Sequence, residues 1–239
     1  MTWSFLVALA VLTVSVSILT RRAVVAGRRR RLERDLHFRL SRRAAEEDAT
    51  RLGEELAELH IALVTDLLPH PERPAMLDDY GRALEAWEHA RLLLLRATHS
   101  DDVVPATELL AEVGHARACL VARRAGEPVP AGRAPCWFDP THGPGHDTVA
   151  WAPPEGEPRT VAACPACEAR LRTGDAPQAR LVRWSDRWLP WFEAGPAYHA
   201  WAEGYHGPAA RAGPAGVPVR PGGAGVPPRR SIHSSTGRP

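Results

Sequence analysis

Apolar and polar positions first separate an N-terminal segment from the rest of the chain. Residues 3–20, WSFLVALAVLTVSVSILT, contain no charge and no proline. Eighteen residues of helix cover about 27 Å, close to the hydrocarbon thickness of a bilayer. We therefore predict a transmembrane anchor over residues 1–22. A buried helix and a cleaved signal peptide are alternatives, but a signal peptide carries its positive charge before the apolar run, and here Arg21 and Arg22 follow it.

Residues 23–126 have helical periodicity. From about Arg28 to Leu68, one face is apolar at alternating spacings of three and four residues: Ala45, Ala49, Leu52, Leu56, Leu59, Leu63 and Leu67. Two more helices are expected over about 74–98 and 105–124, each with a proline at its start, and Gly126 is the expected stop. The second helix should turn inward with Leu77, Tyr80, Leu84, Trp87 and Leu94, and the third with Leu109, Leu110, Val113, Ala116 and Leu120.

This pattern predicts a basic juxtamembrane arm followed by an antiparallel, coiled-coil-like helical bundle. The apolar face of the first helix would pack on the chain's own next helix. Alternatively it could form a seam with a second subunit.

Residues 127–206 begin with a Pro/Gly-rich linker at 127–135, and the pattern changes after it. Short β-type runs at 147–153 and 158–164, with a turn at PEGE between them, predict a hairpin. The sequence CPACEARL then predicts a helix that begins at Cys164, with Pro165 in its first turn. A hairpin that leads into a helix opening with C-x-x-C is typical of treble-clef-like zinc sites. We therefore expect a small α+β Cys/His module.

Four side chains are the candidate zinc ligands: Cys136, His142, Cys164 and Cys167, with His146 as an alternative to His142. Thiolate and imidazole are the ligands that structural zinc prefers, four at a time. Three other interpretations stay open at this point. The thiols could be reduced and structural, Cys136 and Cys164 could form a disulfide, or the CPAC pair could be redox-active. Asp139 could organise the turn at Pro140.

The aromatic residues after the module have two interpretations. Trp184, Trp188 and Trp191 are spaced by four and three, and Tyr198, Trp201 and Tyr205 follow. They would form a lid that completes a small core, or a belt at the membrane interface. Residues 207–239 are rich in Gly and Pro without apolar periodicity, so we expect a disordered tail.

Charge is unevenly distributed along the 239 residues, although the formal net charge is only +2. All basic residues are Arg; residues 21–43 hold ten against two acids, and residues 44–120 hold six against sixteen. The basic block follows the apolar run, so the positive-inside rule places the N-terminus outside and the bulk of the chain in the cytoplasm. The block lacks interleaved aromatic residues, so we expect no nucleic-acid partner.

Two motifs carry a resemblance to a protein group. The block CWFDPTHGPG with VAWAPPEGEPRTVAACPAC, and the tail WLPWFEAGPAYHAWAEGYHG, resemble a group of uncharacterised actinobacterial single-pass membrane proteins over about residues 1–206. The resemblance implies an anchor-plus-module architecture and no activity.

The expected fold is mainly α: a transmembrane helix, a helical bundle, a small Cys/His module and a disordered tail. No Walker loop, dinucleotide-binding turn, HExxH or nucleophile elbow occurs. We expect a membrane-anchored, non-enzymatic protein that contacts the bilayer and either a protein partner or, through its helices, a second copy of itself. A thiol-redox protein that uses the CPAC pair is the alternative.

Overall fold

The computed structural model describes residues 2–65, 70–131, 134–153, 158–207 and 210, with the backbone alone for residues 2, 4–11, 14 and 65. Three predicted features lie outside these ranges: Leu67, the turn at 154–157 and nearly all of the tail 207–239. The described chain is mainly helical, with two small antiparallel sheets. This agrees with a mainly α protein that carries a small α+β module.

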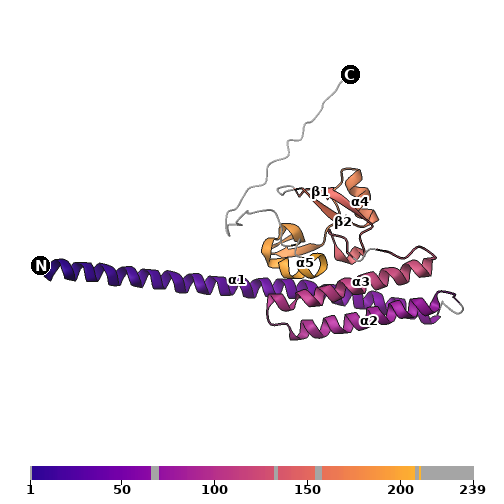
Figure 1. Ribbon diagram of the computed structural model, residues 1–239, viewed down its shortest axis with the longest axis horizontal. Coiled ribbons are helices and arrows are strands. Elements are labelled where there is room, and N and C mark those ends of the chain that lie inside the picture. Colours follow the sequence, from indigo (N-terminus) through magenta and orange to yellow (C-terminus); the bar gives the residue numbers. More distant parts are fainter. Residues whose placement is uncertain (1, 66–69, 132–133, 154–157, 208–209, 211–239) are drawn as a thin grey trace, which may run out of the picture.

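Helix α1 (Thr2–Thr65) is a single unbroken helix whose N-terminal part extends away from the rest of the molecule (Figure 1). The apolar segment and the bundle's first helix therefore form one rod. Gly27 does not interrupt it, because one glycine inside a helix costs only about 1 kcal/mol. Just after Gly27, Arg29 Nε pairs with Glu33 Oε1 across one helical turn at 2.9 Å.

Within the described part of the chain, no helix has both the length and the apolar character needed to cross a bilayer. Half of the side chains in the anchor expected over residues 1–22 lie outside the description. It stays a prediction.

Three antiparallel helices form the bundle (Figure 1): the C-terminal part of α1, α2 (Arg73–Arg96) and α3 (Val104–Ala125). A 3-10 turn, η1 (Ser100–Asp102), links α2 to α3. The expected apolar face of α1 is buried from Ala45 to Leu63, apart from the half-buried Leu59, which confirms that it packs within the chain. Pro74 lies in the first turn of α2, and Gly126, with φ 69°, ends α3 as predicted.

One inward position on α2 was predicted wrongly. Leu77 is 43% exposed, whereas Met76 and Asp79 on either side of the expected position are buried. Asp79 accepts a hydrogen bond from Arg123 Nε at 3.0 Å and pairs with Arg82. Met76 packs with Leu63 and Leu120, and the buried carboxylate of Asp79 is paired with arginines, so positions 76 and 79 face inward in place of 77.

The expected hairpin and helix are present in the module. Strand β1 (Asp147–Trp151) pairs antiparallel with β2 (Arg159–Ala163), with Val149 opposite Val161. Helix α4 (Pro165–Arg172) follows directly, with Cys164 as its N-cap and Pro165 at its first position. The sequence signals for the two strands and for the helix start were therefore sufficient here.

The three tryptophans have the spacing of a helix, but the structure has a second hairpin in this region. Strand β3 (Leu181–Trp184) pairs with β4 (Arg187–Pro190), and Ser185 turns the chain with a φ of 56°. Trp188 is 59% exposed, and Trp191 is buried in η3 (Trp191–Glu193). The spacing of four and three is therefore not that of a helix, because Pro190 cannot donate to a helical ladder.

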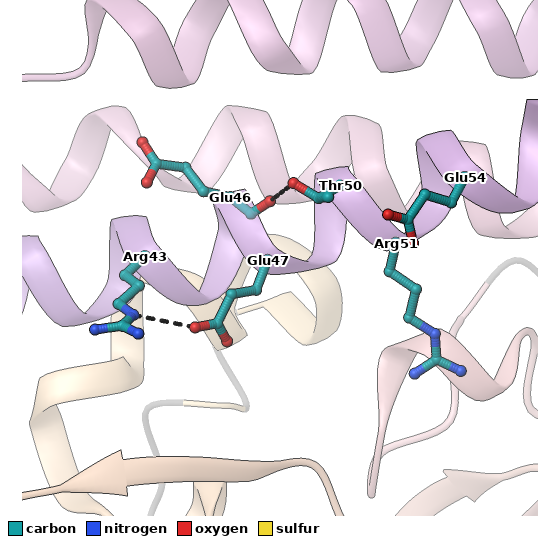
Figure 2. A pocket seen from close by; sticks show the side chains of 6 residues that line it. All are labelled: Arg43, Glu46, Glu47, Thr50, Arg51 and Glu54. Atoms are coloured by element: carbon teal, nitrogen blue, oxygen red, sulfur yellow. Dashed lines mark hydrogen bonds and ion pairs between the residues drawn. The ribbon is translucent and has the colours of Figure 1, made fainter.

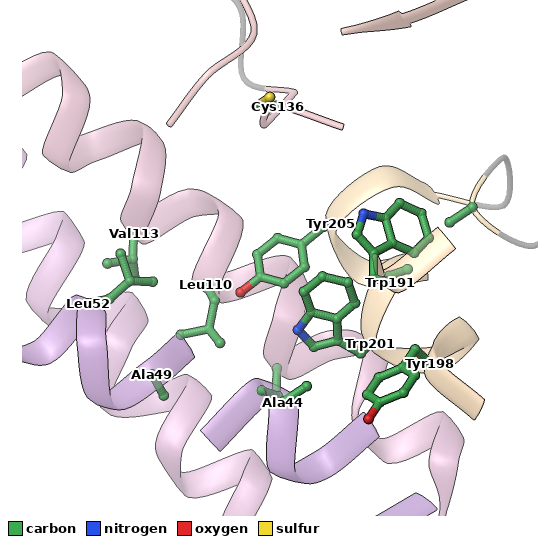
Figure 3. Close-up of a cluster of buried hydrophobic side chains, with 14 of the residues drawn as sticks. Ala44, Ala49, Leu52, Leu110, Val113, Cys136, Trp191, Tyr198, Trp201 and Tyr205 are labelled. Carbon is green, nitrogen blue, oxygen red and sulfur yellow. The ribbon is translucent and has the colours of Figure 1, made fainter. Parts of the chain in front are cut away.

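The remaining aromatic residues form the predicted lid. It comprises η3, η4 (Gly195–Tyr198) and α5 (His199–His206), and it packs on α1 and α3. Figure 3 shows Tyr198, Trp201 and Tyr205 facing the bundle residues Ala44 and Leu110. A Cβ atom at Gly204 would overlap Thr107 Oγ1 and the Val104 carbonyl oxygen, so α5 can approach α3 this closely only with glycine there.

One hydrophobic cluster runs from Ala44 in the bundle through Trp201 in the lid to Cys136 in the module. A buried carboxylate fixes the lid within it. Trp201 Nε1 donates to Asp48 Oδ2 at 2.7 Å, and the Tyr205 hydroxyl donates to the same oxygen at 3.2 Å. The lid therefore joins the module to the bundle.

Candidate metal centre

Four predicted side chains come together at one point of the module. The ligand atoms of Cys136, His142, Cys164 and Cys167 all lie within 4.8 Å of one another. The three cysteines are buried and His142 is half-buried. None of the four cysteines of the chain forms a disulfide. This group of three thiols and one imidazole can hold a metal ion such as zinc.

A short loop positions the first two of these side chains. Pro135 and Pro144 form an isolated bridge, and Cys136 N–H donates to the Gly143 carbonyl at 2.9 Å, which closes the loop. Inside it, the 3-10 turn η2 (Pro140–His142) presents His142. Asp139 caps this turn by accepting from Thr141 N at 2.9 Å, so it organises the Pro140 turn as the sequence suggested.

The start of α4 positions the other two. Cys164 is the N-cap and Cys167 lies in the first turn, so both thiols sit at the end of the helix where backbone N–H groups point outward. Negative charge is favoured there by the helix dipole. A C-x-x-C pair at a helix start is therefore suited to bind a cation as two thiolates.

The distances match the geometry of tetrahedral zinc. Bonds of about 2.3 Å to sulfur and about 2.0 Å to nitrogen, at the tetrahedral angle, place a sulfur and a nitrogen about 3.5 Å apart. His142 Nδ1 lies 3.5 Å from Cys167 Sγ and 3.7 Å from Cys164 Sγ. His142 would therefore bind through Nδ1.

Hydrogen bonds within the cluster shift the pKa values of His142, Cys164 and Cys167. The thiol of Cys136, followed by that of Cys164, raises the pKa of His142 to about 10. Hydrogen bonds with Cys136 and Cys167 lower the pKa of the Cys164 thiol, whereas hydrogen bonds with Cys136 and Cys164 raise the pKa of the Cys167 thiol. Protons and a metal ion therefore compete for the same sulfur and nitrogen atoms. A metal ion replaces those protons, which makes its affinity depend on pH.

The alternative ligand His146 is placed elsewhere. It is exposed, and its Nδ1 lies 3.2 Å from Asp147 Oδ2, in a second group that includes Glu168. Glu168 already pairs with Arg172 at 2.6 Å. The structure therefore brings together Cys136, His142, Cys164 and Cys167 and leaves His146 on the surface.

Sequence reasoning missed the residues that support the centre from the bundle. Arg51 NH1 donates to Thr141 Oγ1 at 2.7 Å, and Arg117 NH2 approaches the Thr141 carbonyl at 3.5 Å. The pairing of Arg51 with Glu55 can be predicted from the sequence, because residues four apart are neighbours on a helix. Nothing in the spacing indicates their contact with a loop 90 residues away.

An open hollow on the bundle offers no comparable chemistry. Figure 2 shows its six lining residues, Arg43, Glu46, Glu47, Thr50, Arg51 and Glu54, all of which belong to α1. Their charges pair along the helix, as in the 3.1 Å contact between Arg43 and Glu47. A hollow with one helix as its wall does not enclose a substrate.

Comparisons with protein-family models, with curated proteins and with solved structures find no match, so the function must be argued from the residues of this chain.

Proposed function

We propose that this chain is a membrane-anchored, non-enzymatic protein whose Cys/His module holds one structural zinc ion and serves protein–protein contact. The observation that carries the proposal is the buried set of three thiols and one imidazole within 4.8 Å. A catalytic zinc keeps one coordination position for water or substrate. Here the protein itself supplies four ligands, which favours a structural role.

The burial of the thiols argues against the thiol-redox alternative. Cys164 is 5% exposed and Cys167 is 1% exposed. A redox-active cysteine reacts by direct attack between its sulfur atom and that of the partner, so its sulfur must be accessible. A thioredoxin-like site also requires a βαβ framework, whereas each described sheet is a two-stranded antiparallel pair.

The continuity of α1 supports a defined position relative to a membrane. If residues 3–20 span a bilayer, the twenty residues from Arg21 to Leu40 extend about 30 Å as a helix. Arginine side chains close to the anchor would contact anionic headgroups. The cell membrane, with the N-terminus outside and the module in the cytoplasm, is the proposed location.

The proposed contact is with a protein rather than a nucleic acid. The apolar face of α1 between Ala45 and Leu63 is already buried inside the bundle. Self-association through helices would therefore use the free N-terminal part of α1, where Leu32 is 68% exposed and Leu36 is 40% exposed. A separate protein partner would meet the module.

The test is the zinc content and free-thiol count of the purified full-length chain, in wild type, Cys164→Ser and Cys119→Ser. Cys119 is a matched control, because it is buried but lies outside the cluster. We expect one zinc per chain in wild type and Cys119→Ser, and less than a tenth of that in Cys164→Ser. A folded wild-type chain without zinc after expression in zinc-replete medium would contradict the proposal.

Topology needs a separate test. The native thiols are buried, so we would place a reporter in the tail, as S231C, and label intact cells with a membrane-impermeant maleimide. The proposal predicts labelling only after lysis. Labelling from outside would place the module on the opposite side of the membrane.

A further inference from the structure

We propose that metal binding is coupled to docking of the module on α1 and α3. The residues that carry this coupling surround the metal centre: Asp139, Thr141 and an arginine clamp from the bundle. The arginine clamp consists of Arg51, Glu55 and Arg117. The inference rests on the proposed metal site. It adds residues that are not ligands but that orient the ligand His142.

The first step is the contact between His142 and Asp139. His142 Nδ1 faces the sulfur atoms, and Nε2 lies on the opposite side of the ring, 3.9 Å from Asp139 Oδ2. An imidazole that binds a metal through Nδ1 carries its proton on Nε2. Metal-bound histidines commonly donate this proton to a carboxylate, which fixes the ring and raises its basicity. In the structure this contact is an ion-pair distance, and Oδ2 is the Asp139 oxygen that faces the imidazole.

Asp139 is itself held in place by Thr141. Asp139 Oδ1 accepts from Thr141 N at 2.9 Å and from Thr141 Oγ1 at 2.7 Å. Both bonds use Oδ1, which leaves Oδ2 for His142. The hydroxyl has one proton. Because that proton goes to Asp139, Thr141 Oγ1 is an acceptor for its other partner.

That partner comes from the bundle. Arg51 NH1, on α1, donates to Thr141 Oγ1 at 2.7 Å. The result is a directed chain from Arg51 through Thr141 to the Asp139 carboxylate and on toward the imidazole. Thr141 and Asp139 are buried, at 5% and 7% exposure. Hydrogen bonds in such surroundings are stronger than those in water.

Glu55 joins the two arginines of the clamp. Its Oε1 lies 3.1 Å from Arg51 Nε, and its Oε2 lies 2.6 Å from Arg117 NH1. Arg117, on α3, also approaches the Thr141 carbonyl at 3.5 Å. Helices α1 and α3 therefore both hold the turn η2 that presents His142.

The consequence is a reciprocal coupling. Contacts that hold His142 in its binding orientation raise the affinity for the metal, and by linkage a bound metal strengthens the contacts of η2 with the bundle. Metal occupancy of the centre would then change the stability of the contacts between η2 and the helical bundle.

The test measures the affinity of full-length protein for Co²⁺ by its thiolate-to-metal absorption, and for Zn²⁺ by competition with a chelator. The variants are Asp139→Asn, Thr141→Val, Thr141→Ser and Arg51→Met. Asn at 139 can still cap the turn, but it presents no charge to His142. Arg43→Met is the matched control, because Arg43 pairs with Glu47 at 3.1 Å on the same helix, as Arg51 does with Glu55, and is not part of the clamp.

We expect Asp139→Asn to weaken metal binding by about 10- to 100-fold. Thr141→Val and Arg51→Met should weaken it less, Thr141→Ser should restore it, and Arg43→Met should leave it unchanged. Added metal should raise the melting temperatures of Asp139→Asn and Arg51→Met by less than that of wild type, because weaker binding stabilises the folded state less.

Two results would overturn the inference. If wild type binds metal and Asp139→Asn and Arg51→Met bind it equally well, Asp139 and the arginine clamp have no role, although the centre itself stands. If wild type binds neither metal, the proposed function fails and this inference fails with it.

Discussion

The helical bundle and the Cys/His module share one hydrophobic cluster but are built from elements of different kinds. In the bundle, α2 and α3 are more than twenty residues long and bury small side chains that allow close helix packing: Ala83, Ala86, Ala90, Ala106 and Ala116. In the module, α4 has eight residues and each sheet has two strands. Short helices and isolated hairpins are marginal in water. We therefore expect the bundle to be stable through its own apolar contacts, and the module to depend on the shared cluster and on a cross-link.

The largest expected effect separates these two regions. Removal of zinc with a chelator should unfold the module and leave the bundle helical, since structural zinc contributes about 10 kcal/mol or more to folding. Hydrogen exchange read by mass spectrometry should show fast exchange over residues 135–171 and retained protection over 73–125. Equal loss of protection in both regions would mean that they fold as one unit.

A second effect concerns the buried Asp48 that fixes the lid. Burial raises the pKa of this carboxyl from 3.8 to about 6, and Arg180 opposes the shift only in part. The folded state thus binds the proton more tightly than the unfolded state, so this group's contribution to stability falls as the pH rises from about 4 through 6. The pKa difference corresponds to about 3 kcal/mol.

Denaturation of wild type and Asp48→Asn between pH 4 and 8 checks this contribution. The free energy of unfolding of wild type should fall relative to that of the variant as the pH rises. Parallel pH profiles would show that Asp48 has an ordinary pKa in the folded protein.

A third effect tests the contact between lid and bundle. Gly204→Ala places a methyl group against Thr107 and the Val104 carbonyl oxygen, and overpacking of this kind typically costs about 1–3 kcal/mol. Urea denaturation should show a lower midpoint. An unchanged midpoint would mean that α5 does not pack as closely on α3 as described.

The smallest effect is a gain within the bundle. Gly81 lies on an exposed turn of α2, and a Cβ atom there would meet nothing within 4 Å. Gly81→Ala should stabilise the helix by about 0.5–1 kcal/mol, because alanine loses less conformational freedom on folding. This variant also serves as the control for Gly204→Ala, since both make the same chemical change. Destabilisation by Gly81→Ala would show that an unseen neighbour covers this face.

Local signals predicted much of the fold. The spacing from Ala45 to Leu63 gave the buried face of α1, Pro74 gave the start of α2, and Gly126 gave the end of α3. The clustering of Cys136, His142, Cys164 and Cys167 was also predictable, because C-x-x-C at a helix start and a C-x5-H loop each have a defined local geometry. These features depend on residues close together in the sequence.

Features that depend on distant residues were not predictable. Leu77 was expected on the inward face because it lies at a helical spacing from the other apolar residues. The buried carboxylate of Asp79, which pairs with Arg123 from a distant helix, lies on that face instead. The second hairpin was hidden because the tryptophans that form it have a helix-like spacing. The contact of Arg51 with Thr141 joins residues 90 positions apart, and no spacing indicates it.

The zinc K-edge X-ray absorption spectrum of the full-length protein tests the central claim most directly. A structural zinc held by Cys136, His142, Cys164 and Cys167 predicts three sulfur neighbours at about 2.3 Å and one nitrogen at about 2.0 Å, with no water in the coordination sphere. Oxygen ligands in place of sulfur, or a folded protein free of zinc, would contradict it.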